Sequence, residues 1–298
     1  MIDLRQQGFE WKDLSPIFNM PANALRKAYY RYCNVKPDRT QQNTPKVLIF
    51  DIETSPILAH VWALFDQNVA LNQIERDWNI LSWSAKWLGE ERVMYADQSK
   101  APDISDDKDI LKQIWDLLDE ADIVITQNGI KFDSKKLNAR FIMQGMLPPS
   151  SYRHVDTLRI AKRYFAFTSN KLEYMTAKLC TKYKKLDHAK FSGFKLWSEC
   201  LKGNKAAWDE MKEYNCHDVL SLEELYLKLR AWDKTINFNV YSDNTNHTCV
   251  CGASEFKKHG FVYTNTAKYR RLICESCGAE SRETENLLSK EKRNSLKK

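Results

Sequence analysis

Two acidic residues lie in a stretch of the chain whose apolar neighbouring residues predict a buried strand. In "KVLIFDIETSP", residues 46–56, Asp51 and Glu53 are two positions apart at the end of a short apolar run. Residues at i and i+2 of a strand project from the same face, about 7 Å apart. Buried carboxylates this close repel each other and lose hydration unless a cation lies between them. The spacing therefore predicts a metal site at the end of a buried strand.

More acids are available to such a site farther along the chain. "NGIKFD" contains Asp133, five residues after Asn128, and "EYNCHDV" contains Tyr214 and Asp218. Tyr214 and Asp218 are four residues apart, so they share one face of the long helix predicted there. We therefore expect Asp133 and Asp218 to converge on the strand that bears Asp51.

Taken in order, "FDIET", "NGIKFD" and "YNCHD" resemble the three motifs of the DEDD (DnaQ-like) 3'-to-5' exonucleases of the ribonuclease H-like superfamily. The last motif, a Tyr followed four residues later by Asp, resembles the DEDDy branch, which is also seen in the proofreading domains of B-family polymerases. The DEDDh branch has a His five residues before this Asp, where this chain has Glu213. The resemblance extends over residues 47–232.

The resemblance implies a two-metal phosphodiester hydrolase. Asp51, Glu53, Asp133 and Asp218 would bind two Mg²⁺ or Mn²⁺ ions, since hard oxygen ligands suit these metals. One ion would activate the attacking water, the other would stabilise the leaving 3' oxygen, and Tyr214 would orient the water with help from Glu53. The expected reaction releases nucleoside 5'-monophosphates from 3' ends, and DNA is favoured over RNA as the substrate.

Other functions remain open. A 3'-to-5' exoribonuclease would use the same site, because the choice of sugar depends on a contact to the 2'-hydroxyl. A nucleic-acid-binding protein with an inactive nuclease fold is the alternative from another class, which metal-dependent turnover would exclude. A structure-specific endonuclease is a third, which end-blocked substrates would test.

The surrounding patterns predict an α/β fold, a ribonuclease H-like mixed sheet flanked by helices. A buried strand at 47–54 precedes two strands that fit an antiparallel hairpin. Helices then alternate with further strands, the order expected of an α/β or α+β sheet with an antiparallel portion. The expected strands lie at 47–54, 80–88, 92–97, 122–129 and 154–156, and the expected helices at 106–121, 132–145, 157–165, 170–181 and 205–231.

Composition divides the chain into further parts. The expected parts are a helix-turn-helix module at 1–34, a linker at 35–46, the exonuclease domain at 47–239, a zinc ribbon at 240–285 and a basic tail at 286–298. In the first part, a helix with Leu14 is followed by a turn and a second helix with an apolar face. Its outward basic residues would contact nucleic acid, and these are Arg26, Lys27 and Arg31. A small helical module for protein contacts is the alternative.

Four of the eight cysteines form two close pairs near the C-terminus, which predicts a structural Zn²⁺ site. The expected ligands are Cys249, Cys251, Cys274 and Cys277. The first pair is CxC where zinc ribbons usually have CxxC, so His247 remains an alternative to Cys249. The other cysteines are scattered, which favours reduced thiols over a disulfide framework.

The charge distribution favours a nucleic-acid partner. The net charge is +7, and the excess of Lys and Arg lies toward the two ends while the middle is near neutral. Beyond the first module, the expected nucleic-acid contacts are Asn128, Lys182, Lys184, Lys185, Lys268, Arg270 and Arg271. Solvated surface charge and, for Asn128, capping of a turn are the alternatives.

The composition excludes a wholly disordered chain. At 298 residues and 43% hydrophobic content the chain can bury a core. The first residues contain no apolar signal segment, and no apolar run approaches the roughly 18 residues that span a bilayer. We expect an intracellular, cytoplasmic protein without a membrane partner; its compactness is phage-like, which would place it in the host cytoplasm. The sequence leaves its oligomeric state open.

Overall fold

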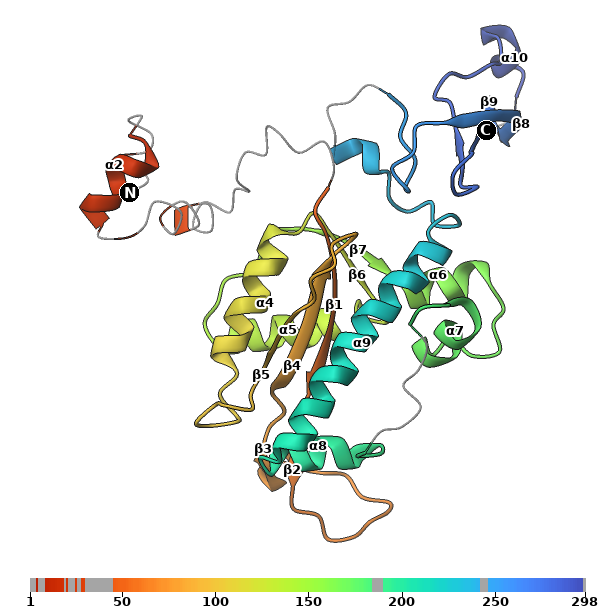
Figure 1. Ribbon diagram of the computed structural model, residues 1–298. Helices are drawn as coiled ribbons and strands as arrows, with labels where there is room; N and C mark the ends of the chain where they lie inside the picture. The colour runs from red at the N-terminus through yellow and green to blue at the C-terminus, as the bar shows by residue number, and fades with distance from the viewer. Residues whose placement is uncertain are drawn as a thin grey trace. The chain divides into compact units, whose positions relative to one another are not determined.

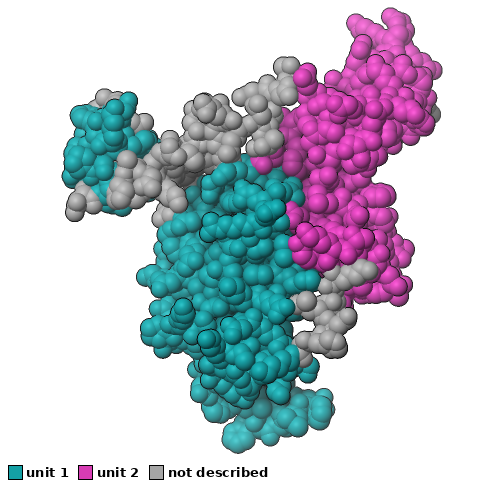
Figure 2. Space-filling view, viewed as in Figure 1, with its two compact units in different colours: residues 1–41, 46–156, 185–222 teal, residues 42–45, 157–184, 223–298 magenta. Residues whose placement is uncertain are grey.

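The computed structural model describes residues 4, 9–18, 20, 25, 28–29, 45–183, 190–241 and 246–296. The chain divides into two compact units (Figure 2). The first comprises residues 1–41, 46–156 and 185–222, and the second comprises residues 42–45, 157–184 and 223–298. Residues 157–184, expected in the nuclease domain, thus group with the C-terminal part of the chain.

A five-stranded mixed sheet forms the centre of the first unit. Its strands are β1 (Val47–Thr54), β4 (Ile80–Trp87), β5 (Met94–Asp97), β6 (Ile123–Thr126) and β7 (Arg153–Asp156). The spatial order is β5-β4-β1-β6-β7. β1 pairs antiparallel with β4 and parallel with β6, so the predicted mixed sheet with an antiparallel hairpin beside the first strand is confirmed.

One face of this sheet is apolar and packs on two helices, α4 (Lys108–Glu120) and α5 (Asp133–Met143) (Figure 1). Leu48, Phe50 and Ile52 alternate along β1 and are all buried in this core. Because side chains of a strand alternate between faces, Asp51 and Glu53 project from the opposite face. The core thus determines which way the acids point.

The opposite face is covered by α8 (Phe194–Leu201) and by the first part of α9 (Lys205–Leu229), which continues into the second unit. Leu81, Leu196 and Trp208 are buried together there. α9 was expected from its apolar spacing. α8 was not expected, because its residues follow a lysine-rich stretch that reads as a loop.

The connection between β1 and β4 contains two short strands, β2 (Leu58–Ala59) and β3 (Ile74–Arg76), and a 3-10 helix, η1 (Leu71–Gln73). β2 and β3 pair antiparallel. None of these elements was expected, since they are only two or three residues long.

The second unit contains two further helices and a small sheet. The helices are α6 (Thr157–Tyr164) and α7 (Leu172–Leu179), and both were expected. After the 3-10 helix η2 (Phe238–Tyr241), the antiparallel strands β8 (Phe256–Thr264), β9 (Ala267–Cys274) and β10 (Glu280–Arg282) form a sheet in the order β10-β9-β8. The expected basic tail contains a five-residue helix, α10 (Lys290–Asn294).

Only part of the expected N-terminal module is described. α2 (Trp11–Phe18) buries Leu14, and Leu25 is buried as well. The rings of Trp11 and Tyr29 are 5.2 Å apart, so residues on both sides of the expected turn approach each other. Arg26, Lys27 and Arg31 lie outside the described residues, so the helix-turn-helix remains a prediction.

Candidate active site

The acids of the first motif lie on β1, beside a strand that provides small polar neighbours. In the β1–β4 pairing, Asp51 is opposite Ser84 and Glu53 is opposite Ser82. Directly opposed residues share one face of a sheet, so the two serines lie beside the two acids. This pairing gives the site a polar lining in an otherwise apolar sheet.

Two side chains donate hydrogen bonds to these acids. The amide Nδ2 of Asn215, on α9, is 2.8 Å from Asp51 Oδ2. The indole Nε1 of Trp197, on α8, is 3.2 Å from Glu53 Oε2. Asn215 is fully buried, and its own side-chain oxygen accepts from the Ser82 hydroxyl. One oxygen of each carboxylate is thereby oriented by a donor from another element.

Asp133 enters the site at the start of α5 and is buried. Its carboxylate accepts from the main-chain N–H of Ile52, which lies between the two acids of β1. The preceding turn is tightly constrained, because a Cβ on Gly129 would lie 2.3 Å from Thr126 Oγ1. Asn128 adopts φ 65°, a left-handed conformation that Asn tolerates better than most residues.

Asp156 stabilises the same turn. It directly precedes α6, and its carboxylate accepts from the main-chain N–H groups of Asn128 and Ile130. The main chain of Asn128 thus helps to shape the turn before Asp133. Its contact with nucleic acid stays a prediction.

The third motif lies on α9. Tyr214 and Asp218 interact as expected for residues four apart on one face of a helix, since the Tyr214 hydroxyl partly offsets the rise in the pKa of Asp218. Tyr214 is 39% exposed, so its ring reaches the solvent side of the site. The ring lies edge-on to Trp197, with centroids 6.2 Å apart, and this contact restricts its orientation.

The four carboxylates repel one another in a poorly hydrated environment. Burial, followed by the charges of Asp133, Glu53 and Asp218, raises the pKa of Asp51 well above its usual range. Burial, with Asp218 as the next cause, raises the pKa of Glu53 to about 8. Burial also raises the pKa values of Asp133 and Asp218 to about 7 each. Asp51 thus lies close enough to the other three acids for their charges to act on it.

This donor set suits hard divalent cations. Carboxylate oxygens are the preferred protein ligands of Mg²⁺ and Mn²⁺. Bound cations would also offset the burial and the repulsion that raise the pKa values of Asp51 and Glu53. The donor chemistry of these residues therefore fits hard divalent cations.

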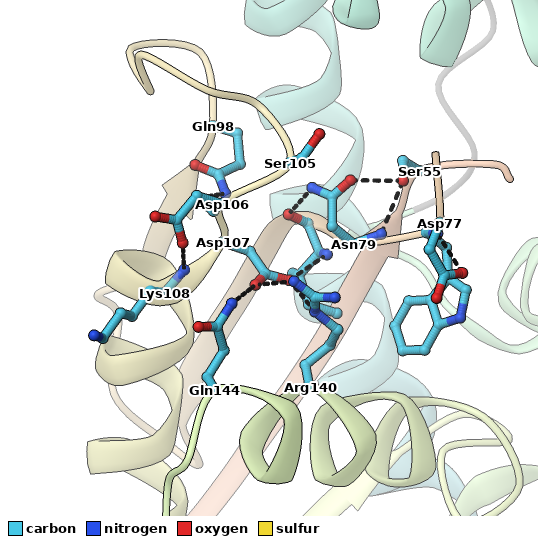
Figure 3. A network of polar contacts seen from close by, with 12 residues as sticks. Ser55, Asp77, Asn79, Gln98, Ser105, Asp106, Asp107, Lys108, Arg140 and Gln144 are labelled. Atoms are coloured by element: carbon cyan, nitrogen blue, oxygen red, sulfur yellow. Dashed lines mark hydrogen bonds and ion pairs between the residues drawn. The ribbon is translucent and has the colours of Figure 1, made fainter. Parts of the chain in front are cut away.

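A buried polar network fixes the elements next to the site (Figure 3). Asp107, fully buried, accepts from Arg140 Nε and Nη2 at 2.7 Å each and from the Ile80 N–H at 2.9 Å. On the neighbouring strand end, the Ser55 hydroxyl donates to Asn79 Oδ1 at 2.8 Å. The network joins α5, which begins with a site acid, to β4 and to the end of β1. Sequence reasoning missed it, because its members are far apart in the chain.

The cysteines form a second, separate cluster in the second unit. The sulfur atoms of Cys249, Cys251, Cys274 and Cys277 all lie within 4.8 Å of one another, so they could bind a metal ion. His247 is not in the cluster; its Nε2 is 3.0 Å from the Ser281 hydroxyl and its ring packs on Phe256. This geometry favours Cys249 over His247 as the fourth ligand. The donor set fits the tetrahedral thiolate coordination of Zn²⁺.

The other predicted nucleic-acid contacts are distributed differently. Lys184 and Lys185 lie outside the described residues, whereas Lys182 is exposed. Lys268 and Arg270 lie on β9 next to aromatic rings. Arg271 is occupied within the fold, since its Nε donates to the His259 carbonyl at 2.7 Å and its Nη1 is 3.5 Å from Glu280.

The sequence contained a signal for Asn215 that the motifs alone did not reveal. Met211, Asn215, Val219 and Leu222 are all buried along α9, so a polar amide interrupts an apolar stripe. A buried amide requires partners, which here are Asp51 and Ser82. Trp197 had no comparable signal.

Comparison with known proteins identifies the family of the chain. The family model of the RNase_H superfamily matches residues 48–230. A solved structure of the family B DNA polymerase from the hyperthermophilic archaeon Pyrobaculum calidifontis matches with a TM-score of 0.49 and 16% identity, over 63% of this chain and 25% of the polymerase chain. Curated protein sequences gave no match. None of the helices in the described part of the chain has the length and apolar character needed to cross a bilayer. Because the family match covers more than half of its residues, the chain belongs to the RNase_H superfamily.

Proposed function

We propose that the protein is a metal-dependent 3'-to-5' exonuclease of the DEDDy type that acts on DNA. The RNase H-like fold is a nuclease fold, so nucleic acid is the substrate class. The observation that supports the finer proposal is that acids of all three motifs lie close enough for the charges of Asp133, Glu53 and Asp218 to raise the pKa of Asp51. A protein that only binds nucleic acid would not need four repelling carboxylates.

In this mechanism the chain positions the reacting groups. Bound Mg²⁺ or Mn²⁺ would supply Lewis-acid activation of water and stabilisation of the leaving oxygen. Asn215 and Trp197 keep the oxygens of Asp51 and Glu53 directed into the site. The partly exposed Tyr214, next to Asp218 on the same helix, would orient the attacking water.

The remaining parts would hold the substrate near this site. We assign a DNA-contacting helix-turn-helix to residues 1–34, a nuclease domain to 47–239 and a zinc ribbon to 240–285, with a linker at 35–46 and a basic tail at 286–298. Four clustered thiols support the structural zinc, and the basic residues of β9 support contact with DNA. The proposal places the protein in the cytoplasm.

The test is digestion of 5'-labelled single-stranded DNA and of the same sequence as RNA, with Mg²⁺, Mn²⁺ or neither. The expected result is a metal-dependent ladder that shortens from the 3' end, faster on DNA, and is abolished in Asp218→Asn. Asp209→Asn is the matched control, because Asp209 is an exposed acid on the same helix.

Further substrates separate the alternatives. A 3'-blocked strand should resist digestion, whereas internal cleavage of it would indicate an endonuclease. Faster loss of RNA would indicate an exoribonuclease. If the wild-type protein binds both strands and degrades neither, the exonuclease proposal is refuted.

A further inference from the structure

The β8–β9 hairpin places two aromatic rings and two cations together on one face. In its register Phe261 is opposite Arg270 and Tyr263 is opposite Lys268. Directly opposed residues of antiparallel strands project from the same face, and alternate residues of one strand do so too. All four side chains therefore share one face, which we call the hairpin face.

The cations of the hairpin face lie against Phe261. Lys268 Nζ is 3.9 Å and the Arg270 guanidinium carbon is 4.6 Å from the centroid of this ring. Tyr263 is 68% exposed and lies 5.8 Å from Lys268 Nζ. Phe261 therefore positions the two cations, while the ring of Tyr263 remains accessible to a ligand.

The two cations form no ion pair within the part of the chain that the structure describes. Among the described residues, no carboxylate lies within ion-pair distance of Lys268 or Arg270. Neighbouring basic residues differ, because Lys258 pairs with Glu283 and Arg271 pairs with Glu280. The sheet thus satisfies some of its cations internally and leaves these two for an external anion.

We propose that the hairpin face binds single-stranded DNA, with Lys268 and Arg270 contacting adjacent phosphates and Tyr263 stacking on a base. Exposed aromatic rings combined with unpaired cations are the usual means of binding a single strand without sequence preference. The choice of DNA rests on the proposed function, whereas the binding itself does not require the acidic site. Arg271 is not part of the hairpin face, because its side chain donates a hydrogen bond to the His259 carbonyl.

Binding is measured with the full-length Asp51→Asn variant, which we expect not to digest the probe. The probe is a fluorescent oligothymidylate, and the readout is anisotropy across a series of salt concentrations. Lys268→Gln with Arg270→Gln should weaken binding and reduce the slope of log affinity against log salt by about 1.4, since each phosphate contact to a single strand contributes about 0.7.

Substitutions of Tyr263 test the stacking. Tyr263→Ala should weaken binding about 5- to 100-fold and leave the salt slope unchanged. Tyr263→Phe should retain binding, because the ring is preserved. Lys257→Gln is the matched control, since Lys257 is exposed on the same strand and is opposite Ile273 rather than a residue of the hairpin face. Zinc content and thermal midpoint confirm that each variant is folded.

The inference is refuted if Tyr263→Ala and the double variant bind the probe as tightly as Lys257→Gln. That result, together with normal digestion by the corresponding variants of the active protein, would leave the proposed exonuclease intact. Conversely, binding that depends on the hairpin face in a protein that digests no strand would refute only the exonuclease. If the hairpin face binds only protein, Tyr263→Ala and the double variant should bind the probe as tightly as Lys257→Gln.

Discussion

Replacing Asp133 by Asn should stabilise the metal-free protein at neutral and alkaline pH while abolishing its activity. Asp133 is 3% exposed, and burial raises its pKa from 3.8 to about 7. The folded state therefore binds this proton more tightly than the unfolded state does. It follows that the contribution of Asp133 to the free energy of unfolding decreases as pH rises from about 4 to about 7 and stays lower above that range.

The magnitude follows from the two pKa values. Each tenfold difference in proton affinity corresponds to about 1.4 kcal/mol, so ionised Asp133 destabilises the folded protein by about 4 kcal/mol. Asn has nearly the same shape, does not ionise, and retains an oxygen that can accept from the Ile52 N–H. The variant should therefore match the wild type near pH 4 and exceed it by up to about 4 kcal/mol at pH 8.

The assay is urea denaturation followed by tryptophan fluorescence at pH 4 and pH 8, in buffer without Mg²⁺ and without chelator. Added Mg²⁺ should stabilise the wild type at pH 8 by mass action and have no such effect on Asp133→Asn. Asp209→Asn should behave as the wild type in both buffers. Equal stability of wild type and Asp133→Asn at pH 8 without Mg²⁺, or a stability difference between them that does not grow from pH 4 to pH 8, would refute the reasoning.

Four further outcomes are expected. Asn215→Ala, which removes the donor to Asp51, should destabilise the protein by about 1–3 kcal/mol and lower kcat at least tenfold with little change in KM, as measured by urea denaturation and steady-state digestion. Arg140→Leu should cost about 3–5 kcal/mol in urea denaturation because Asp107 is left buried without its cation; a loss below 1 kcal/mol would contradict this. At subsaturating Mg²⁺, activity should rise between pH 6 and pH 8, because protons compete with the metal at Glu53, whose pKa is about 8; a profile falling with pH would be inconsistent. A zinc-selective chelator should release about one Zn²⁺ per chain and abolish oligothymidylate binding, whereas retained binding after zinc loss would show that the cluster does not stabilise the hairpin.

Local patterns determined much of the fold. An apolar run without alternation predicted the buried strand at 47–54, and the spacing of Asp51 and Glu53 predicted that both lie on one face of it. Apolar spacing predicted α4, since burial of one face is a property of a single helix. Paired cysteines likewise predicted the cluster that the structure brings together.

The sequence by itself thus determined the central elements and the acidic residues, because strand and helix periodicity and the spacing of motif residues are local. Only the tertiary structure decided the partners of those residues. Asn215 reaches Asp51 from 164 positions along the chain, and Trp197 reaches Glu53 from 144. Such contacts depend on how helices pack on a sheet. The ion pair of Arg271 with Glu280 likewise depends on the tertiary structure, and Arg271 is therefore not part of the hairpin face. No local pattern encodes them, because each partner lies on a different element.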